Sequence, residues 1–463
     1  MFKKLGKWWN APDNSNDSML DPVPWKLRRT AWSLIFVSFG WGFTVTPLFI
    51  GSILAAGANS SDMIASICIG DLMLFALSIL ICIPAYRTGC NNPLLFRFVF
   101  GRHGWKVPCS VIVICGLGWQ GGLTGWFAEV VVGVGSEYFT PVAVMGGILV
   151  IISIYFGIKG IEVVGNAAVI FLSGAAALCF YLCINEAGGL NGLIALADGD
   201  KGVETVSREQ MTNMVVGSLA VGASVSADFT RFCKKGWVVF MFVAINFFFV
   251  QPVLQILGIA GVLVFDSHLF SAYASIVNSA FYIFCLISLI FAVWTTCNSN
   301  AYFTQVSFSN VTKKNLRVSA VVVGGVGLVS AAFGFSNYVG TFIDFLATVI
   351  PPLVGIVTVD YYFIHKMKYD IKLRGRIPNW NPAAVIAYVI AVMVAFLYTP
   401  PFLATAVWGP LMSSVLYAIT YAIFTKAGIK CGYSVVSQEQ TGPWNPMERA
   451  IAEGQLTAKE KGA

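Results

Sequence analysis

The sequence predicts an all-α integral membrane protein with twelve transmembrane helices. Hydrophobic residues make up 57% of its 463 residues and charged residues only 11%, and the mean hydropathy is +0.76. A soluble domain usually carries about 25% charged residues, so a soluble protein is excluded. Apolar runs of the length that crosses a bilayer, about 20 residues, recur along the whole chain, and the loops between them alternate in basic content.

The predicted spans follow one another with mostly short connections. They cover residues 30–56, 63–84, 107–135, 142–158, 164–183, 211–227, 237–264, 276–308, 318–334, 339–363, 381–398 and 403–425. The eighth run is longer than a bilayer core requires. We therefore expect its ends to lie outside the lipid.

Lys and Arg gather in alternate loops, and this distribution predicts the orientation. The N-terminus, the loop between spans 2 and 3 and the loop after span 10 are basic, whereas the loops AGANSSD, GSEYFT and YTPPFLA contain neither Lys nor Arg. By the positive-inside rule both termini are cytoplasmic. The net charge of +7 then reflects topology and does not indicate nucleic-acid binding.

The predicted organisation is a cytoplasmic tail (1–29), a transmembrane domain (30–425) and a second cytoplasmic tail (426–463). The first tail is polar and amphipathic and lacks the pattern of a signal peptide. The eleven cysteines lie mostly in apolar runs without a CxxC pair, so we expect small core residues rather than disulfides or a metal site. No nucleophile–base pair or metal cluster has usable spacing, which argues against an enzyme and against a cofactor.

Spans 1 and 6 contain the most glycine and hydroxyl residues. Span 1 reads SFGWGFTVTP, and span 6 reads VVGSLAVGASVSADF. Each glycine alone is explained by close helix packing. A matched pair of breaks at positions one and six is also what an inverted repeat of five plus five helices produces, with a substrate site at the breaks.

Five segments carry a family resemblance: GLGWQG (116–121), YFGIKGIEVV (155–164), SADFTRF (226–232), WTTCNSNAYFTQVSFSNVT (294–312) and IPPLVGIVTVDYYF (350–363). They resemble the nucleobase:cation symporter-1 family, also called the purine–cytosine permease family, and most closely its cytosine permeases. The resemblance implies a LeuT-like five-plus-five inverted repeat with discontinuous helices 1 and 6. Repeat one would cover about 30–183, repeat two about 211–363, and two extra helices 381–425.

The resemblance also implies a function. Members import a planar heterocycle with Na⁺ or H⁺ by alternating access, in which spans 1, 2, 6 and 7 rock against spans 3, 4, 8 and 9. The expected substrate is a cytosine-type nucleobase; the alternatives are a purine, allantoin or hydantoin, or hydroxymethylpyrimidine, a thiamine precursor. A channel or a sensor is the competing class, but tails of about 30 residues offer a sensor no soluble output domain. We expect a monomer in the plasma or inner membrane, with no partners besides substrate and lipid.

The resemblance assigns Trp119 as the aromatic platform on which the heterocycle stacks. Its alternative role is structural, because Trp119 and Trp126 are seven residues apart and can form a packed or lipid-facing stripe. Further substrate contacts are expected from the residues Gly42, Gln120, Ser218, Leu219 and Asn298.

A cation site carries over from the family in the same way. The resemblance implies a Na⁺ site made by carbonyl groups near Gly40 and Phe43, the carbonyl of Ala292, and the hydroxyls of Thr295 and Thr296. The alternative is that both threonines bond back to their own helix, as is common in membrane helices.

Several positions depart from the cytosine permeases. Leu219 stands where they have a phenylalanine, and Gly116, Ala292 and Val221 replace a glutamine, an asparagine and a serine that read the edge of the base. Because buried polar groups left unpaired are costly, such edge contacts discriminate strongly. Their loss makes a different or larger ring plausible.

Three acidic residues lie inside predicted spans: Asp71, Glu129 and Asp344. Carboxylates within a membrane are expensive and are functional candidates, either for a coupling proton, for a cation or for a positively charged ring. Asp344 is also close enough to the outer end of its span to be simply near water. Asp228 is expected to form a structural ion pair with Arg231.

Overall fold

The computed structural model describes residues 21–133, 135–155, 158–199, 205–267, 269, 274–369, 377–401 and 403–432, without the side chains of 158–170. Most of both predicted tails and the loop residues 200–204 and 370–376 lie outside the described residues.

Every predicted span coincides with a helix or a group of helices. Spans 1 to 6 correspond to α2 (Ala31–Gly42) with α3 (Val45–Leu54), α4 (Ser60–Thr88), α6 (Lys106–Val132), α7 (Phe139–Tyr155), α8 (Ile158–Glu186) and α10 (Arg208–Val225). Spans 7 to 12 correspond to α12 (Gly236–Ile245) with η2 (Asn246–Val250) and α13 (Gln251–Phe265), α15 (Ser279–Thr312), α16 (Leu316–Ala332), α17 (Val339–Val349) with α18 (Pro351–Thr358) and η4 (Val359–Ile364), α19 (Pro382–Leu397) and α20 (Thr405–Lys426). Shorter helices lie between them: η1 (Trp25–Leu27), α5 (Asn92–Phe100), α9 (Leu190–Asp198), α11 (Ala227–Thr230) and η3 (Phe335–Tyr338).

Some of these helices are long and apolar enough to cross a membrane. Among the described residues, six helices or continuous helix groups are long and apolar enough, or up to eight if each of two bent pairs counts as one span. The bent pairs are α2 with α3, at 42°, and the second half of α8 with α9, at 75°. The helices α7, α16 and α19 are apolar but shorter.

Polar residues in the loops explain where many helices begin. A side chain at the N-cap accepts a hydrogen bond from a backbone N–H of the first turn, which satisfies a donor that the helix leaves free. The N-cap residues with such a bond include Thr30, Asn59, Asn91, Ser207, Asn278, Asn315 and Asn381.

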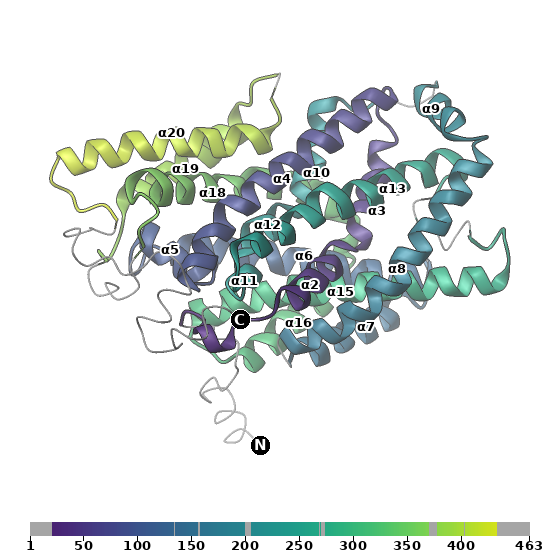
Figure 1. Ribbon diagram of the computed structural model, residues 1–463, viewed down its shortest axis with the longest axis horizontal. Helices are drawn as coiled ribbons and strands as arrows, with labels where there is room; N and C mark the ends of the chain where they lie inside the picture. Colours follow the sequence, from purple (N-terminus) through teal and green to yellow (C-terminus); the bar gives the residue numbers. More distant parts are fainter. Residues whose placement is uncertain are drawn as a thin grey trace, which may run out of the picture.

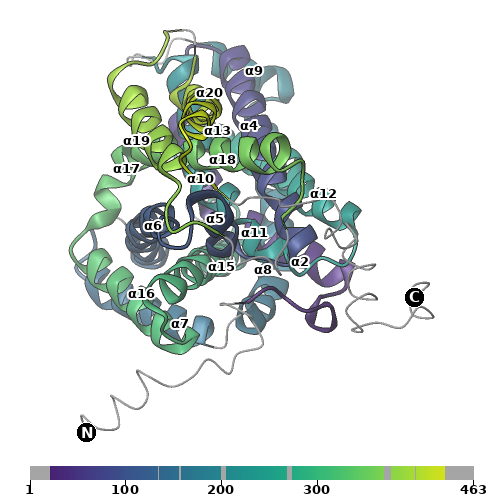
Figure 2. The same ribbon diagram turned by 90° about the vertical axis from the view of Figure 1, so that its left-hand side faces the viewer.

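The helices fall into two packed groups (Figures 1 and 2). In one, α4 packs against α10 and α12, and α13 packs against α3; these elements belong to spans 1, 2, 6 and 7. In the other, α6, α7, α15 and α16 pack against one another; these are spans 3, 4, 8 and 9. The helix α8 contacts both groups through α2, α13 and α15, and α19 and α20 lie side by side at one edge of the molecule.

Span 1 is broken as predicted. The helix α2 ends at Gly42, and Phe43 (ψ 86°) and the extended Thr44 (φ −131°, ψ 163°) turn the chain into α3. Both residues are buried, so the interrupted backbone lies inside the protein, where a break in a membrane span is tolerated.

The break predicted around Gly217–Ser226 of span 6 is absent at both glycines and is reduced to one residue, Ser226. The helix α10 continues through Gly217 and Gly222 to Val225, and only Ser226, with helical angles (φ −56°, ψ −19°), separates it from α11. The hydroxyls of Ser218, Ser224 and Ser226 donate to carbonyls three residues earlier, which keeps them within the helix. The glycines instead permit close packing, since a side chain at Gly217 would collide with Ile343.

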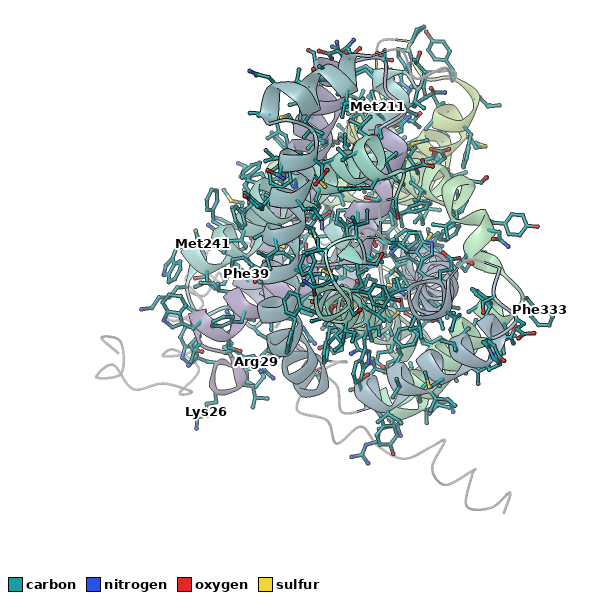
Figure 3. The ribbon with its side chains drawn as sticks, turned by 90° about the vertical axis from the view of Figure 1, so that its right-hand side faces the viewer. Lys26, Arg29, Phe39, Met211, Met241 and Phe333 are labelled. Atoms are coloured by element: carbon teal, nitrogen blue, oxygen red, sulfur yellow. The ribbon has the colours of Figure 1, made fainter. Side chains whose placement is uncertain are left out.

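Basic residues before span 1 lie at one end of the molecule. Lys26 and Arg29 lie together at one end, and Met211, in the first turn of α10, lies at the other (Figure 3). The neighbouring Arg28 is buried and donates through Nη1 to the carbonyls of Tyr86 and Cys233. This arginine fixes the start of span 1 to the ends of spans 2 and 6.

Candidate functional site

The glycine-rich segment of α6 serves helix packing. A side chain at Gly118, Gly122 or Gly125 would meet Phe342, Val339 or Ser336 at 2.6–2.7 Å, and one at Gly121 would meet Ser330 at 2.6 Å. A side chain at Gly116 would collide with Thr304 of α15. The glycines therefore let α15, α16, η3 and α17 approach α6 closely, as small residues do in membrane helices.

The tryptophans of the same segment are buried together. Trp119 and Trp126 are each 5% exposed, and their rings meet edge to face with 5.8 Å between centroids. Trp126 also contacts Phe49 of α3, at 4.6 Å, and Trp119 lies 6.4 Å from Phe342 of α17. A lipid-facing stripe is thus excluded, and the aromatic cluster connects span 3 with α3, the second half of the broken span 1.

On the opposite side of the break, Leu219 lies beside Trp41 of α2. A Cβ at Gly222 would be 2.9 Å from both side chains. Trp41 stacks on Phe242 of α12 with 5.7 Å between centroids. Leu219 and Ser218 are both buried, and the Ser218 hydroxyl is held by the Val215 carbonyl.

Gln120 and Asn298 point into contacts between helices. Gln120 Oε1 accepts from Asn300 Nδ2 at 2.8 Å, and Asn298 Oδ1 accepts from Ser153 Oγ at 2.7 Å. Both amides are buried, and Gln120 Nε2 and Asn298 Nδ2 have no partner in the described part of the chain. Each amide is therefore fixed by its oxygen and retains N–H groups that can donate.

The predicted cation-binding oxygens of α15 converge. Thr295 Oγ1 and Thr296 Oγ1 both donate to the Ala292 carbonyl, at 2.9 and 2.7 Å. Both side chains are buried, and α15 packs against α2 and α3, on which Gly40 and the break at Phe43 lie. The back-bonding alternative is present, but it gathers three oxygens around one point, and each hydroxyl keeps a lone pair.

The three intramembrane acids differ sharply in burial. Asp71 is 2% exposed, Glu129 is partly buried beside Ser336, and Asp344 is exposed. Only the first of the three is enclosed by protein.

Arg231 interacts electrostatically with Asp228, as predicted, and backbone groups bind both side chains. Arg231 Nε donates to the backbone carbonyl of Asp228 at 3.1 Å, whereas Asp228 Oδ1 accepts from the backbone N–H of Asn92 at 2.8 Å. The carboxylate thus lies at the N-terminus of α5, where a negative charge is stabilised.

Four further buried polar residues lie on spans 1 and 7, and the three amides among them were not singled out from the sequence. Thr46 Oγ1 has no partner in the described chain, and Asn246, Gln251 and Gln255 line the inner face of span 7. Gln251 Nε2 donates to the Gly42 carbonyl at 3.2 Å. The signal that would have found the three amides is their spacing, four to five residues apart in the otherwise apolar run NFFFVQPVLQ.

A family model described as a permease for cytosine/purines, uracil, thiamine and allantoin matches residues 22–423. The chain belongs to this permease family. Its members are permeases and not enzymes, and with its apolar helices the chain is a multi-pass membrane protein.

Two relatives in this permease family have established names. The cytosine permease of Escherichia coli is 25% identical over 377 residues, which cover 81% of this chain and 88% of the relative. The hydantoin permease of Microbacterium maritypicum is 22% identical over 461 residues, which cover 90% of this chain and 93% of the relative.

Solved structures share the fold. Mhp1, a nucleobase-cation-symport-1 family transporter, in a closed conformation with bromovinylhydantoin bound, superposes with a TM-score of 0.77 at 17% identity, over 95% of this chain and all of Mhp1. A Na⁺-coupled sialic acid symporter superposes with a TM-score of 0.62 at 12% identity, over 89% of this chain and 92% of its own.

Proposed function

We propose that this permease imports a planar, nucleobase-like heterocycle together with Na⁺ or H⁺ by alternating access. The observation that carries the proposal is the buried break of span 1 between α2 and α3, against which α15 packs, together with the oxygens of Ala292, Thr295 and Thr296 gathered on α15. Broken helices of this kind hold substrate and coupling ion in secondary transporters. The five-plus-five repeat, cytoplasmic termini and a monomeric state belong to the same proposal.

The two packed groups of helices supply the moving parts. Spans 1, 2, 6 and 7 would rock against spans 3, 4, 8 and 9, with the site between them. A heterocycle stacked on Trp119 would lie between the two groups of helices. The Trp119 indole belongs to span 3, and Trp126 connects it to Phe49 of α3 in span 1. The N–H groups of Gln120 and Asn298 that lack a partner would read the edge of the ring.

The proposed substrate class remains wider than cytosine. Leu219 and Gly116 leave fewer polar groups at the site than the cytosine permeases have, and a small side chain at Gly116 is already required by Thr304. A purine, a hydantoin or allantoin, and hydroxymethylpyrimidine are the alternatives to a cytosine-type base.

Thermal stabilisation of the purified protein tests this function. A ligand that binds only the folded state raises the unfolding temperature according to its concentration over its Kd. The panel is cytosine, uracil, adenine, hypoxanthine, allantoin, hydantoin and hydroxymethylpyrimidine, each in NaCl and in choline chloride. We expect one ring to stabilise the protein, more strongly in Na⁺ or at lower pH. No shift with any ring, together with no uptake in proteoliposomes, would overturn the proposal.

A further inference from the structure

Asp71 and Gln255 form an isolated pair inside the group of spans 1, 2, 6 and 7. Asp71 lies on α4 and Gln255 on α13, and neither side chain is exposed beyond 2%. Gln255 Nε2 donates to Asp71 Oδ1 over 3.4 Å. The other two oxygens of the pair, Asp71 Oδ2 and Gln255 Oε1, have no hydrogen-bond partner in the described part of the chain.

Both atoms without a partner are acceptors, so what the pair lacks is a donor. A proton added to Asp71 Oδ2 supplies it: the Oδ2–H group donates to Gln255 Oε1, while Gln255 Nε2 donates to Asp71 Oδ1. Carboxylic acid and carboxamide then form two complementary hydrogen bonds. Without the proton, Asp71 would be a buried carboxylate whose one hydrogen bond is the long bond from Gln255 Nε2. Burying a charge with so little compensation is costly.

Among the residues that the structure describes, no charged side chain beside Asp71 offsets a carboxylate at this position. The stretches of α10, η2 and α13 that pack on the middle of α4, residues 212–225 and 246–265, contain no Asp, Glu, Lys, Arg, His, Cys or Tyr. On α4 itself, Cys68 is exposed, and Cys82 lies eleven residues away beside Ser226. The other titratable groups of α4, α10 and α13 lie near the ends of these helices: Asp62 bound to Arg208, Glu209, Tyr86, Arg87 and Asp266. The remaining ones lie on, or directly after, the neighbouring elements α5, α9, α11 and η4: Arg97, Asp198, Asp228, Arg231, Asp360 and Tyr362.

Two further amides, Gln251 and Asn246, lie between the pair and the break in span 1 along span 7. Gln251 lies one helical turn before Gln255 on α13, donates to the Gly42 carbonyl at 3.2 Å and approaches Asn246 Oδ1 at 3.4 Å. Asn246 begins η2, a π-helical turn, and such turns often occur at functional sites. The pair thus lies one helical turn along α13 from the amide that binds the backbone where span 1 bends.

We propose that Asp71 and Gln255 form a proton-binding site, with the Asp71 carboxyl group protonated in this conformation and its proton serving as a coupling ion. The step is the addition of one proton from water to the carboxylate, and its release returns the carboxylate. The site is distinct from the oxygens around Ala292. The protonation stands on the geometry alone, whereas the coupling role rests on the proposed import activity.

Infrared spectroscopy of the purified protein at neutral pH tests the protonation. The carbonyl stretch of a protonated carboxylic acid is expected in the wild type and lost, by one group, in Asp71→Asn. Asparagine keeps the shape and both hydrogen bonds to Gln255, so this variant should fold; Asp71→Ser serves the same comparison if it does not. Asp62→Asn, on the same helix but at its water-exposed end, should leave the band unchanged.

Proteoliposomes test the coupling. Substrate exchange at equal pH should persist in Asp71→Asn, whereas uptake should lose its response to an imposed pH gradient; Asp62→Asn should keep this response. If no heterocycle is exchanged by the wild type, the import function fails, while the infrared result still decides the protonation. If the wild type exchanges substrate but its protonated band is unchanged in Asp71→Asn, the proton site is wrong, and a metal cation would be the group that balances Asp71.

Discussion

Trp126 stands edge to face against Trp119, with 5.8 Å between the ring centroids and 73° between the ring planes. Because both rings are buried, the indole of Trp126 fixes the orientation of Trp119. Trp126 also touches Phe49 in α3, the second half of span 1. One aromatic ring therefore lies between α3 and the proposed platform.

Replacing Trp119 by alanine should remove stacking of the heterocycle. Aromatic contacts add about 0.5–1.5 kcal/mol beyond the area they bury, so we expect affinity to fall at least about tenfold and uptake to be lost. Trp119→Phe should retain part of the affinity. Binding measured by thermal stabilisation in the two variants checks this, and wild-type affinity in Trp119→Ala would contradict the assignment.

Replacing Thr295 or Thr296 by valine should weaken Na⁺ dependence. Valine keeps the shape of threonine but removes an oxygen from the three gathered at Ala292. We expect the Na⁺ concentration for half-maximal stabilisation to rise about tenfold or more, since a hydrogen bond or contact to a charge contributes about 1.5–3 kcal/mol. Thr312→Val, which removes a similar back-bond to Phe308 at the exposed end of α15, is the control and should leave this concentration unchanged.

The sequence predicts the membrane class, the positions of the helices and the break in span 1 because each depends on local composition and on the solvent around the chain. It overestimates the break in span 6, because Gly217 and Gly222 serve contacts with α17 and Trp41 that no local pattern reveals. The spacing of the amides in span 7 marks them in the sequence, but the residues that they contact cannot be read from it. Their importance comes from Asp71 and Gly42, which lie about 180 and 210 positions away along the chain.

Replacing Tyr417 by phenylalanine should destabilise the C-terminal helices. The buried Asp360 carboxylate accepts hydrogen bonds from Tyr417 and Tyr369, both at 2.5 Å, and His365 Nδ1 lies 3.0 Å from its Oδ2. Loss of one donor to a buried charged group costs about 1–3 kcal/mol. A lower unfolding temperature with unchanged substrate preference is expected. Tyr398→Phe, at an exposed position, should have no effect.

Tyr369 should make stability depend on alkaline pH. Burial, and then the neighbouring Asp360 carboxylate, raise the pKa of Tyr369 well above its usual value. The folded protein therefore holds this proton above about pH 10, where the unfolded chain releases it, and stability falls as the pH rises past that point. Unfolding temperatures of the wild type between about pH 8 and 11 should fall more steeply than those of Tyr369→Phe. Parallel slopes would contradict this.

Replacing Gly51 by alanine should disturb α3, the second half of span 1. A Cβ at this position would collide with the Gln255 carbonyl and come within 2.8 Å of Gly258 Cα, and backbone atoms cannot rotate away as a side chain can. Overpacking of this kind costs about 1–3 kcal/mol, so we expect a lower unfolding temperature. Transport should also be impaired, because α3 would be pushed away from α13. Gly325→Ala is the matched control: nothing lies within 4 Å of its added Cβ, and alanine is favoured over glycine inside a helix by about 1 kcal/mol. If both alanines behaved alike, the close contact between α3 and α13 would not constrain the broken span.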